Sequence, residues 1–192
     1  MLNIGVLISG GGTNLQSLID NIENGYIKGE IKIVISNRKD AYGLIRAEKA
    51  GIEALYIDPS GLSDKNYNKK IIEELEKRNI ELVVLAGYLK ILSKEFIQKY
   101  NKRIINIHPS LLPDFGGKGY YGDRVHKAVL ESGKKVTGAT VHFVDEGTDT
   151  GEIILQEKVE IKADDTVESL KARVLEVEHR LLVEAIRMLT QI

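Results

Sequence analysis

Short apolar runs alternate with longer amphipathic segments through the first half of the chain. The apolar runs are bounded by glycine, proline or polar residues, which predicts buried strands at residues 3–9, 31–35, 53–57, 82–86 and 103–107. The segments between them have helical apolar spacing, at residues 13–22, 41–50, 64–78 and 93–100, the first capped by Thr13 or Asn14. Strands and helices in alternation predict a parallel sheet with helices on both faces.

The pattern changes after Pro109. A glycine-rich loop leads to a helix expected at residues 123–132, and two strands follow at 136–144 and 153–161. The link between these strands, residues 145–152, is too short for a parallel crossover and predicts an antiparallel hairpin. The last helix is expected from Thr166 to about Leu189, with Asp165 and Glu168 as its capping-box pair.

These elements predict an α/β fold in which residues 1–192 form a single domain. Its open twisted sheet is expected to be parallel and Rossmann-like in the N-terminal half and mixed in the C-terminal part, with a long C-terminal helix. No repeat, low-complexity segment or linker interrupts the sequence.

The composition excludes several classes of protein. With 27 basic and 28 acidic residues, the chain has no surplus of positive charge for a nucleic acid. The absence of cysteine excludes disulfides and cysteine-ligated zinc, and no histidine spacing matches a metal motif, so we expect no metal. No apolar stretch approaches the ~20 residues of a membrane helix, and the N-terminal run lacks the basic residues of a signal peptide. We therefore expect a cytoplasmic protein without a membrane partner.

Gly10-Gly11-Gly12-Thr13-Asn14 joins the first expected strand to the first expected helix. Free N–H groups at a helix start, together with the helix dipole, attract an anion, so this turn is a candidate phosphate site. The alternative is a tight turn without a ligand. A dinucleotide site is not favoured, because Leu15 stands where the G-x-G-x-x-G pattern needs its third glycine, and no P-loop motif occurs.

Asn106 and His108 share one face of the fifth expected strand, at the edge where open α/β sheets bind ligands. A carboxamide beside an imidazole is a candidate donor pair for a developing oxyanion, although a histidine at a strand end is more often structural. The hairpin turn Asp145–Gly151 holds three acidic residues. Such turns usually only shape the chain, but one of these carboxylates could instead lie near His108.

Glu178 interrupts the apolar stripe of the last helix. The stripe is expected to comprise Val167, Leu170, Val174, Val177, Leu181 and Ala185. Considered alone, a glutamate on such a row favours a boundary position with its carboxylate in water.

Five segments together resemble one family. The segments are Ile8–Leu15, similar to its phosphate loop; Leu85–Leu92, similar to its folate-contact segment; Asn106–Pro113, similar to its catalytic strand end; Val141–Val144 with Asp149, similar to its folate loop and catalytic acid; and Glu178–His179, where its C-terminal helix touches substrate. The family is phosphoribosylglycinamide formyltransferase. The segments occur in its order and at compatible spacing over essentially the whole chain.

The resemblance implies a role for each matching residue. The catalytic residues would be Asn106, His108 and Asp149, with His142 in support. The ribonucleotide would be held by Gly12, Thr13, Asn14 and Glu178. The folate contacts would come from Leu89, Lys90, Ile91, Leu92, Asn106, Asp145, Glu146, Gly147, Thr148 and Asp149.

Two departures from the family limit the carry-over. Relatives often carry an arginine near position 64, where this chain has Asp64-Lys65, so Lys65 is the candidate stand-in at the folate site. The Asp114–Gly122 segment is longer than in many relatives and rich in glycine and tyrosine, so no substrate contact transfers to it.

The implied reaction moves a formyl group from 10-formyltetrahydrofolate, a co-substrate, to the amine of glycinamide ribonucleotide in purine biosynthesis, with only small-molecule substrates. The amine would attack directly while Asn106 and protonated His108 stabilise the oxyanion, and Asp149 would raise the proton affinity of His108. Nothing in the sequence predicts an oligomeric state.

Three alternatives stay open at this point. They are a formyltetrahydrofolate hydrolase, another folate-dependent formyltransferase such as that for methionyl-tRNA, and a phosphate binder without catalysis on the same fold. The first two families add a further domain. This chain begins at its first expected strand and ends after one helix, so it is expected to have room for neither.

Overall fold

Strands and helices follow one another in the order that the hydrophobic pattern predicts, in a computed structural model that describes residues 1–191. The strands are β1 (Leu2–Ile8), β2 (Gly29–Ser36), β3 (Glu53–Tyr56), β4 (Leu82–Leu85), β5 (Ile104–His108), β6 (Val136–Phe143) and β7 (Ile153–Glu160). The helices are α1 (Thr13–Glu23), α2 (Tyr42–Lys49), α3 (Asp64–Glu76), α4 (Lys94–Lys99), α5 (Asp123–Glu131) and α6 (Val167–Leu189). Their ends lie within two residues of the predicted ends, and several coincide with them.

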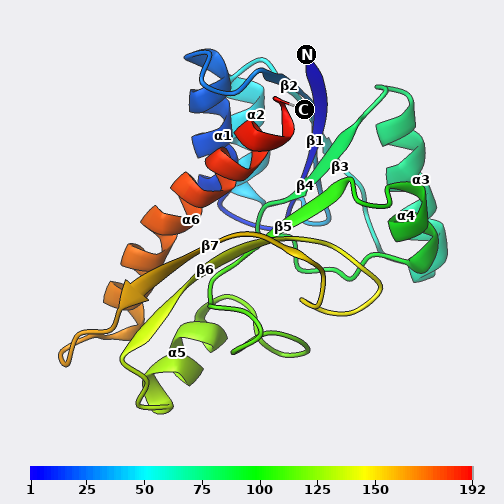
Figure 1. The fold of residues 1–192 in the computed structure, drawn as a ribbon. Coiled ribbons are helices and arrows are strands. Elements are labelled where there is room, and N and C mark those ends of the chain that lie inside the picture. Colours follow the sequence, from blue (N-terminus) through cyan, green and yellow to red (C-terminus); the bar gives the residue numbers. More distant parts are fainter. Residues whose placement is uncertain (192) are drawn as a thin grey trace.

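The strands form one mixed sheet in the order β3-β2-β1-β4-β5-β6-β7 (Figure 1). β1 to β5 are parallel, whereas β6 pairs antiparallel with both β5 and β7, which confirms the predicted hairpin. The strand order reverses direction at β1 and β4. Ligands of open α/β sheets bind beyond the carboxyl ends of the strands at such a reversal.

Two apolar cores lie on opposite faces of the sheet. Helices α1, α2, α5 and α6 cover one face, and α3 and α4 cover the other (Figure 1). Alternation along the strands supplies both cores, since Val6 and Ile8 face the first group of helices and Leu7 faces the second. In β5, Ile105 and Ile107 belong to the α6 side, so the residues between and after them point to the opposite face.

The start of α1 differs from the prediction. Gly12, not Thr13 or Asn14, is the N-cap residue, and its backbone is left-handed with φ 72°. A Cβ atom on Gly12 would lie 2.6 Å from the Cα atom of Gly43. Because α2 packs so closely on this turn, the cap position accepts only glycine.

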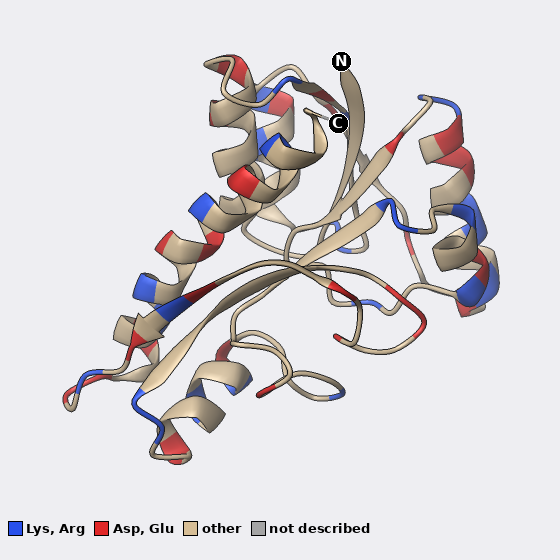
Figure 2. Ribbon diagram, viewed as in Figure 1, with Lys and Arg blue, Asp and Glu red and all other residues tan. Residues whose placement is uncertain are grey.

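The capping box of α6 also differs from the prediction. Thr166 and Ser169 form it, since each side chain accepts a hydrogen bond from the backbone N–H of the other. Asp165 instead accepts hydrogen bonds from Arg173, at 2.6 Å, and from the Ser169 hydroxyl. Basic and acidic residues alternate along the outer side of α6, while its inner side carries the predicted stripe (Figure 2). Of that stripe, Val167 alone is only half-buried.

No helix among residues 1–191 is both long and apolar enough to span a bilayer.

Candidate active site

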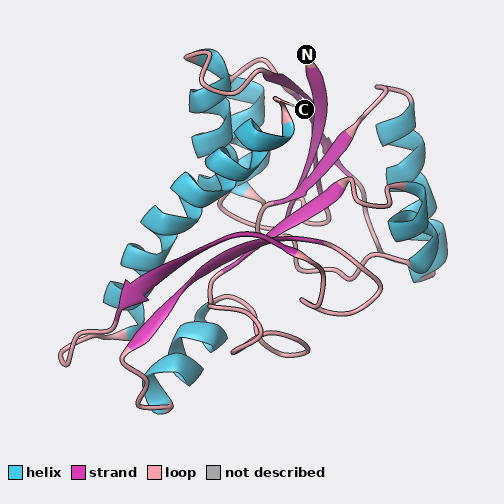
Figure 3. Ribbon diagram, viewed as in Figure 1, coloured by secondary structure: helices cyan, strands magenta, loops and turns pink. Residues whose placement is uncertain are grey.

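Three loops meet around one cavity of about 360 Å³ on the α3 and α4 side of the sheet. They are residues 87–92 after β4, residues 117–122 before α5, and residues 144–149 between β6 and β7, all drawn as loop in Figure 3. Asn106, His108 and His142 line the same cavity from the strands. The structure therefore brings together the predicted catalytic residues and the predicted folate segments.

The mouth of the cavity carries exposed apolar side chains. Leu89 and Ile91 lie on one wall, and Tyr120 and Tyr121 come from the 117–122 loop. Exposed apolar side chains beside a cavity make this surface a candidate for covering a ligand. The sequence predicted no contact for the tyrosines, because their loop departs from the family pattern and no substrate contact could be carried over to it.

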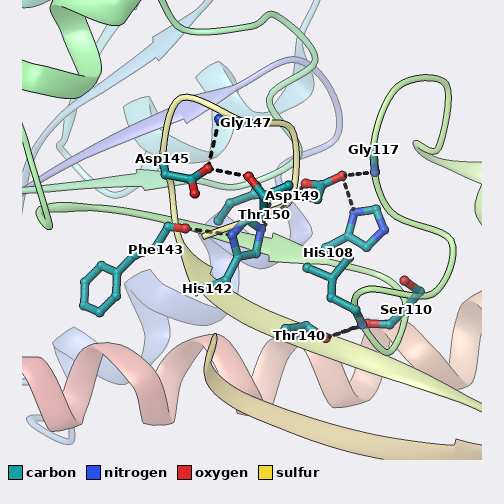
Figure 4. A network of polar contacts seen from close by, with 12 residues as sticks. His108, Ser110, Gly117, Thr140, His142, Phe143, Asp145, Gly147, Asp149 and Thr150 are labelled. Carbon is teal, nitrogen blue, oxygen red and sulfur yellow. Dashed lines mark hydrogen bonds and ion pairs between the residues drawn. The ribbon is translucent and has the colours of Figure 1, made fainter. Parts of the chain in front are cut away.

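His108 is buried, and each of its ring nitrogens faces an oxygen atom. Figure 4 shows its contact with Asp149. Its Nε2–H donates a hydrogen bond of 2.8 Å to the carbonyl oxygen of Phe115. Its Nδ1 atom lies 3.6 Å from a carboxylate oxygen of Asp149. The ring is thus fixed with Nε2 donating to a carbonyl and Nδ1 facing a carboxylate. The carboxylate favours binding of a second proton at Nδ1.

Two opposing effects act on the charge of His108. Burial lowers the pKa of His108 below its ordinary value, and this effect exceeds the opposing effects of the Asp149 carboxylate and the Phe115 carbonyl. Asp149 therefore favours the protonated ring, whereas burial favours the neutral one. Burial alone would raise the pKa of Asp149, but His142, His108 and the Gly117 N–H together hold it below the ordinary value, so Asp149 is ionised.

Asn106 and His142 are paired across β5 and β6. The His142 Nδ1–H donates to the Phe143 carbonyl oxygen at 2.9 Å, and its Nε2 atom lies 3.2 Å from the Asn106 amide nitrogen. Asp149 lies 3.6 Å from the same Nε2 atom. His142 thus orients the Asn106 carboxamide within the cavity, in agreement with a supporting position.

The 144–149 loop separates two roles among its acidic residues. Asp145 accepts hydrogen bonds from the Gly147 N–H at 3.0 Å and the Thr150 hydroxyl at 2.6 Å, and so shapes the loop (Figure 4). Asp149 has a left-handed backbone with φ 58° and accepts a hydrogen bond of 2.9 Å from the Gly117 N–H. Of these two acids, Asp149 is the one that reaches the histidines.

The glycine-rich turn is braced from α2 and α6. Arg46 donates a hydrogen bond of 2.7 Å to the Gly11 carbonyl oxygen, and the Asn14 amide donates one of 3.0 Å to Glu178. The first turn of α1 contains no acidic side chain that would repel an anion. The Asn14 Oδ1 atom is buried and finds no hydrogen-bond partner among residues 1–191.

Glu178 corrects the expectation of a carboxylate in water. Its side chain is only 8% exposed, and burial raises its pKa to about 7. Asn14 partly opposes that shift by donating its hydrogen bond. Glu178 is therefore a buried carboxyl group that contacts the start of α1, and not a surface residue.

Lys65 lies exposed in the first turn of α3, away from the lining of the cavity. Lys90 lines the cavity instead, 3.7 Å from an Asp64 carboxylate oxygen and 5.4 Å from the centre of the Tyr67 ring. Within residues 1–191, no group of three or more histidine or acidic side chains has the geometry to hold a metal ion.

Comparison with known proteins identifies the family. Residues 2–186 match the family described as Formyl transferase. The chain is 44% identical to the chloroplastic phosphoribosylglycinamide formyltransferase of Arabidopsis thaliana, over 95% of this chain and 63% of that protein. It is 42% identical to phosphoribosylglycinamide formyltransferase of Haemophilus influenzae, over 100% of this chain and 88% of that protein.

A solved structure, glycinamide ribonucleotide transformylase 1 from Symbiobacterium toebii, superposes with a TM-score of 0.95 at 46% identity, covering 100% of this chain and 88% of that one. The chain spans less than two thirds of the length of its chloroplastic relatives, 63% for the Arabidopsis protein. The match nevertheless extends over nearly all of this chain, the site loops included. The chain belongs to the formyl transferase family, and within it to the phosphoribosylglycinamide formyltransferases.

Proposed function

We propose that the protein transfers the formyl group of 10-formyltetrahydrofolate to the amine of glycinamide ribonucleotide, a step of purine biosynthesis. The observation that carries the proposal is the meeting of Asn106, His108 and Asp149 in one cavity with apolar walls. The names of the relatives add support, since they are phosphoribosylglycinamide formyltransferases and a glycinamide ribonucleotide transformylase.

The ribonucleotide would bind at the start of α1. Backbone N–H groups of Gly12, Thr13 and Asn14 would hold its phosphate, with the helix dipole in support. Glu178 would then accept from the ribose hydroxyls, and Asn14, with an oxygen atom free of partners among residues 1–191, would add a further acceptor. The amine of the substrate would then have to extend over the sheet edge toward His108.

The folate would bind in the cavity. Its fused ring would lie between the 87–92 and 144–149 loops, where polar backbone alternates with apolar side chains. The exposed Leu89, Ile91, Tyr120 and Tyr121 would cover the benzoyl part of the molecule. Lys90, and not Lys65, is the cation placed to meet the glutamate carboxylates, because it alone of the two lines the cavity.

The chemistry is addition followed by elimination. The bond from the substrate amine to the formyl carbon forms, the bond from that carbon to the folate nitrogen breaks, and one proton passes from the amine to the folate nitrogen. Asn106 would donate to the oxyanion of the intermediate. The neutral His108 would accept the proton at Nδ1, 3.6 Å from Asp149, and deliver it onward.

An assay with both substrates tests the proposal. Tetrahydrofolate should appear only when 10-formyltetrahydrofolate and glycinamide ribonucleotide are present together. Equal release without the ribonucleotide would instead identify a hydrolase, and binding of both compounds without turnover would identify a binding protein. The cytoplasm remains the proposed compartment, although the Arabidopsis relative is named chloroplastic.

A further inference from the structure

His108, Thr140 and Gln156 form one row across three strands. His108 of β5 pairs with Thr140 of β6, and Thr140 pairs with Gln156 of β7. All three side chains therefore lie on the same face of the sheet. Gln156 belongs to an outer strand and is largely exposed, but its amide reaches inward over Thr140, which is fully buried.

The Thr140 hydroxyl uses its full hydrogen-bonding capacity. It accepts from the Leu112 N–H at 3.1 Å and from the Gln156 amide at 2.9 Å. Since a hydroxyl has one proton and two lone pairs, that proton is left for the Ser110 carbonyl oxygen, 2.7 Å away. Gln156 donates a second hydrogen bond, of 3.0 Å, to the Leu112 carbonyl oxygen.

These bonds fix the chain that runs from His108 to Phe115. Ser110 and Leu112 are held from β6 and β7, and the Ser110 hydroxyl holds the Asp114 carbonyl oxygen at 2.6 Å. The next residue is Phe115, whose carbonyl oxygen accepts the hydrogen bond of the His108 ring. The position of that acceptor decides which nitrogen of the ring carries the proton.

We propose that Gln156 is a positioning residue, which acts through Thr140 and the Ser110–Phe115 segment to hold the Phe115 carbonyl against His108 Nε2 and keep Nδ1 free for the reaction. The expected effect on kcat rests on the proposed function. The expected effect on the proton position of His108 does not. Buried polar groups in a fully bonded network keep a single geometry, whereas the loss of the Gln156 amide removes the donor to the Leu112 carbonyl and one of the two donors to the Thr140 hydroxyl.

Two variants and one control test the proposal. Gln156→Met keeps the length of the side chain but removes both donated hydrogen bonds. Gln156→Glu places a carboxylate against the Leu112 carbonyl and Thr140 hydroxyl oxygens and should be the more damaging. Lys158→Met, on the same strand and the same face, leaves the network intact and should behave as wild type.

We expect kcat to fall about tenfold or more in Gln156→Met with KM for both substrates unchanged, because small displacements of catalytic groups are costly. The decisive measurement needs no substrate. The ¹⁵N shifts of the His108 ring at neutral pH, which report the nitrogen that carries the proton, should move in Gln156→Met and not in Lys158→Met. An unmoved His108 signal in folded Gln156→Met overturns the role of Gln156, whatever the value of kcat. Absence of formyl transfer by the wild-type protein would overturn only the proposed function. If Gln156→Glu does not fold, Gln156→Met decides alone.

Discussion

The amide nitrogen of Asn14 lies 3.0 Å from a carboxylate oxygen of Glu178, although the two residues are 164 positions apart in the sequence. This contact joins the first turn of α1 to the middle of α6 and buries a carboxyl group beside a turn suited to phosphate. Two effects on the pKa of Glu178 oppose each other. Burial favours the neutral carboxyl group, and the hydrogen bond from Asn14 favours the charged one.

The stability of the protein should depend on pH through Glu178. Its pKa rises from 4.5 to about 7 on folding, so between these values the folded state holds a proton that the unfolded state lacks. Unfolding free energy should therefore fall as pH rises through this window, by about 3 kcal/mol in total. Glu178→Gln removes the titration, and urea unfolding at pH 5 and pH 8 should show a smaller difference than in wild type. Identical pH dependence in both proteins would contradict the assigned burial.

Ribonucleotide binding should weaken when the Asn14–Glu178 pair is broken. Asn14→Ala and Glu178→Ala should each raise KM for glycinamide ribonucleotide about tenfold or more, as expected for the loss of a buried polar contact, with a smaller effect on kcat. Steady-state kinetics with saturating folate measure both constants. An unchanged KM in both folded variants would show that the phosphate site lies elsewhere.

The Asp149–His108 pair should act as one unit. Asp149→Asn and His108→Ala should each lower kcat about 10²–10³-fold, and the double variant should lose far less than the product of the two. Because Asp149 raises the pKa of His108 against the effect of burial, Asp149→Asn should lower the His108 titration midpoint further below its ordinary value. NMR titration of the ring checks the direction. If the two kcat losses multiply in the double variant and the His108 titration midpoint does not move, another residue must supply the carboxylate.

Lys90 should contribute to folate binding and Lys65 should not. Lys90→Met should raise KM for 10-formyltetrahydrofolate several-fold, since an exposed ion pair is worth roughly up to 1 kcal/mol. The matched variant Lys65→Met changes an exposed residue of α3 and should leave that KM at the wild-type value. The opposite result would restore Lys65 as the family stand-in and would place the glutamate tail of the folate along α3.

The fold was open to prediction because its signals are local. Apolar runs and glycine or proline boundaries located the strands and helices to within one or two residues, and the short 145–152 link determined the antiparallel hairpin. The N-cap residue of α6 was harder to predict, because Asp165 and Thr166 are adjacent and both residue types are common caps. Only the three-dimensional pairing of Asp165 with Arg173 decides between them.

Parts of the site were beyond prediction for a different reason. The partner of His108 Nε2 is a backbone carbonyl, that of Phe115, which any residue type could supply. The resting charge of His108 depends on how deeply the ring is buried, and sequence gives no measure of that depth. The helical pattern alone predicts a boundary position for Glu178, because its partner Asn14 lies on the first helix of the chain, and only the family resemblance groups the two residues.

The division of the site between the two sides of the sheet has a kinetic consequence. The turn at residues 10–14 leads into α1, and Glu178 lies on α6 on the same side of the sheet, whereas the cavity lies on the other side. The two adjoin where the Ser9 hydroxyl accepts a hydrogen bond of 2.9 Å from the Leu89 N–H at the cavity wall. For the proposed transfer, each substrate would then reach its site without passing through that of the other. The arrangement therefore predicts that the two substrates can bind in either order.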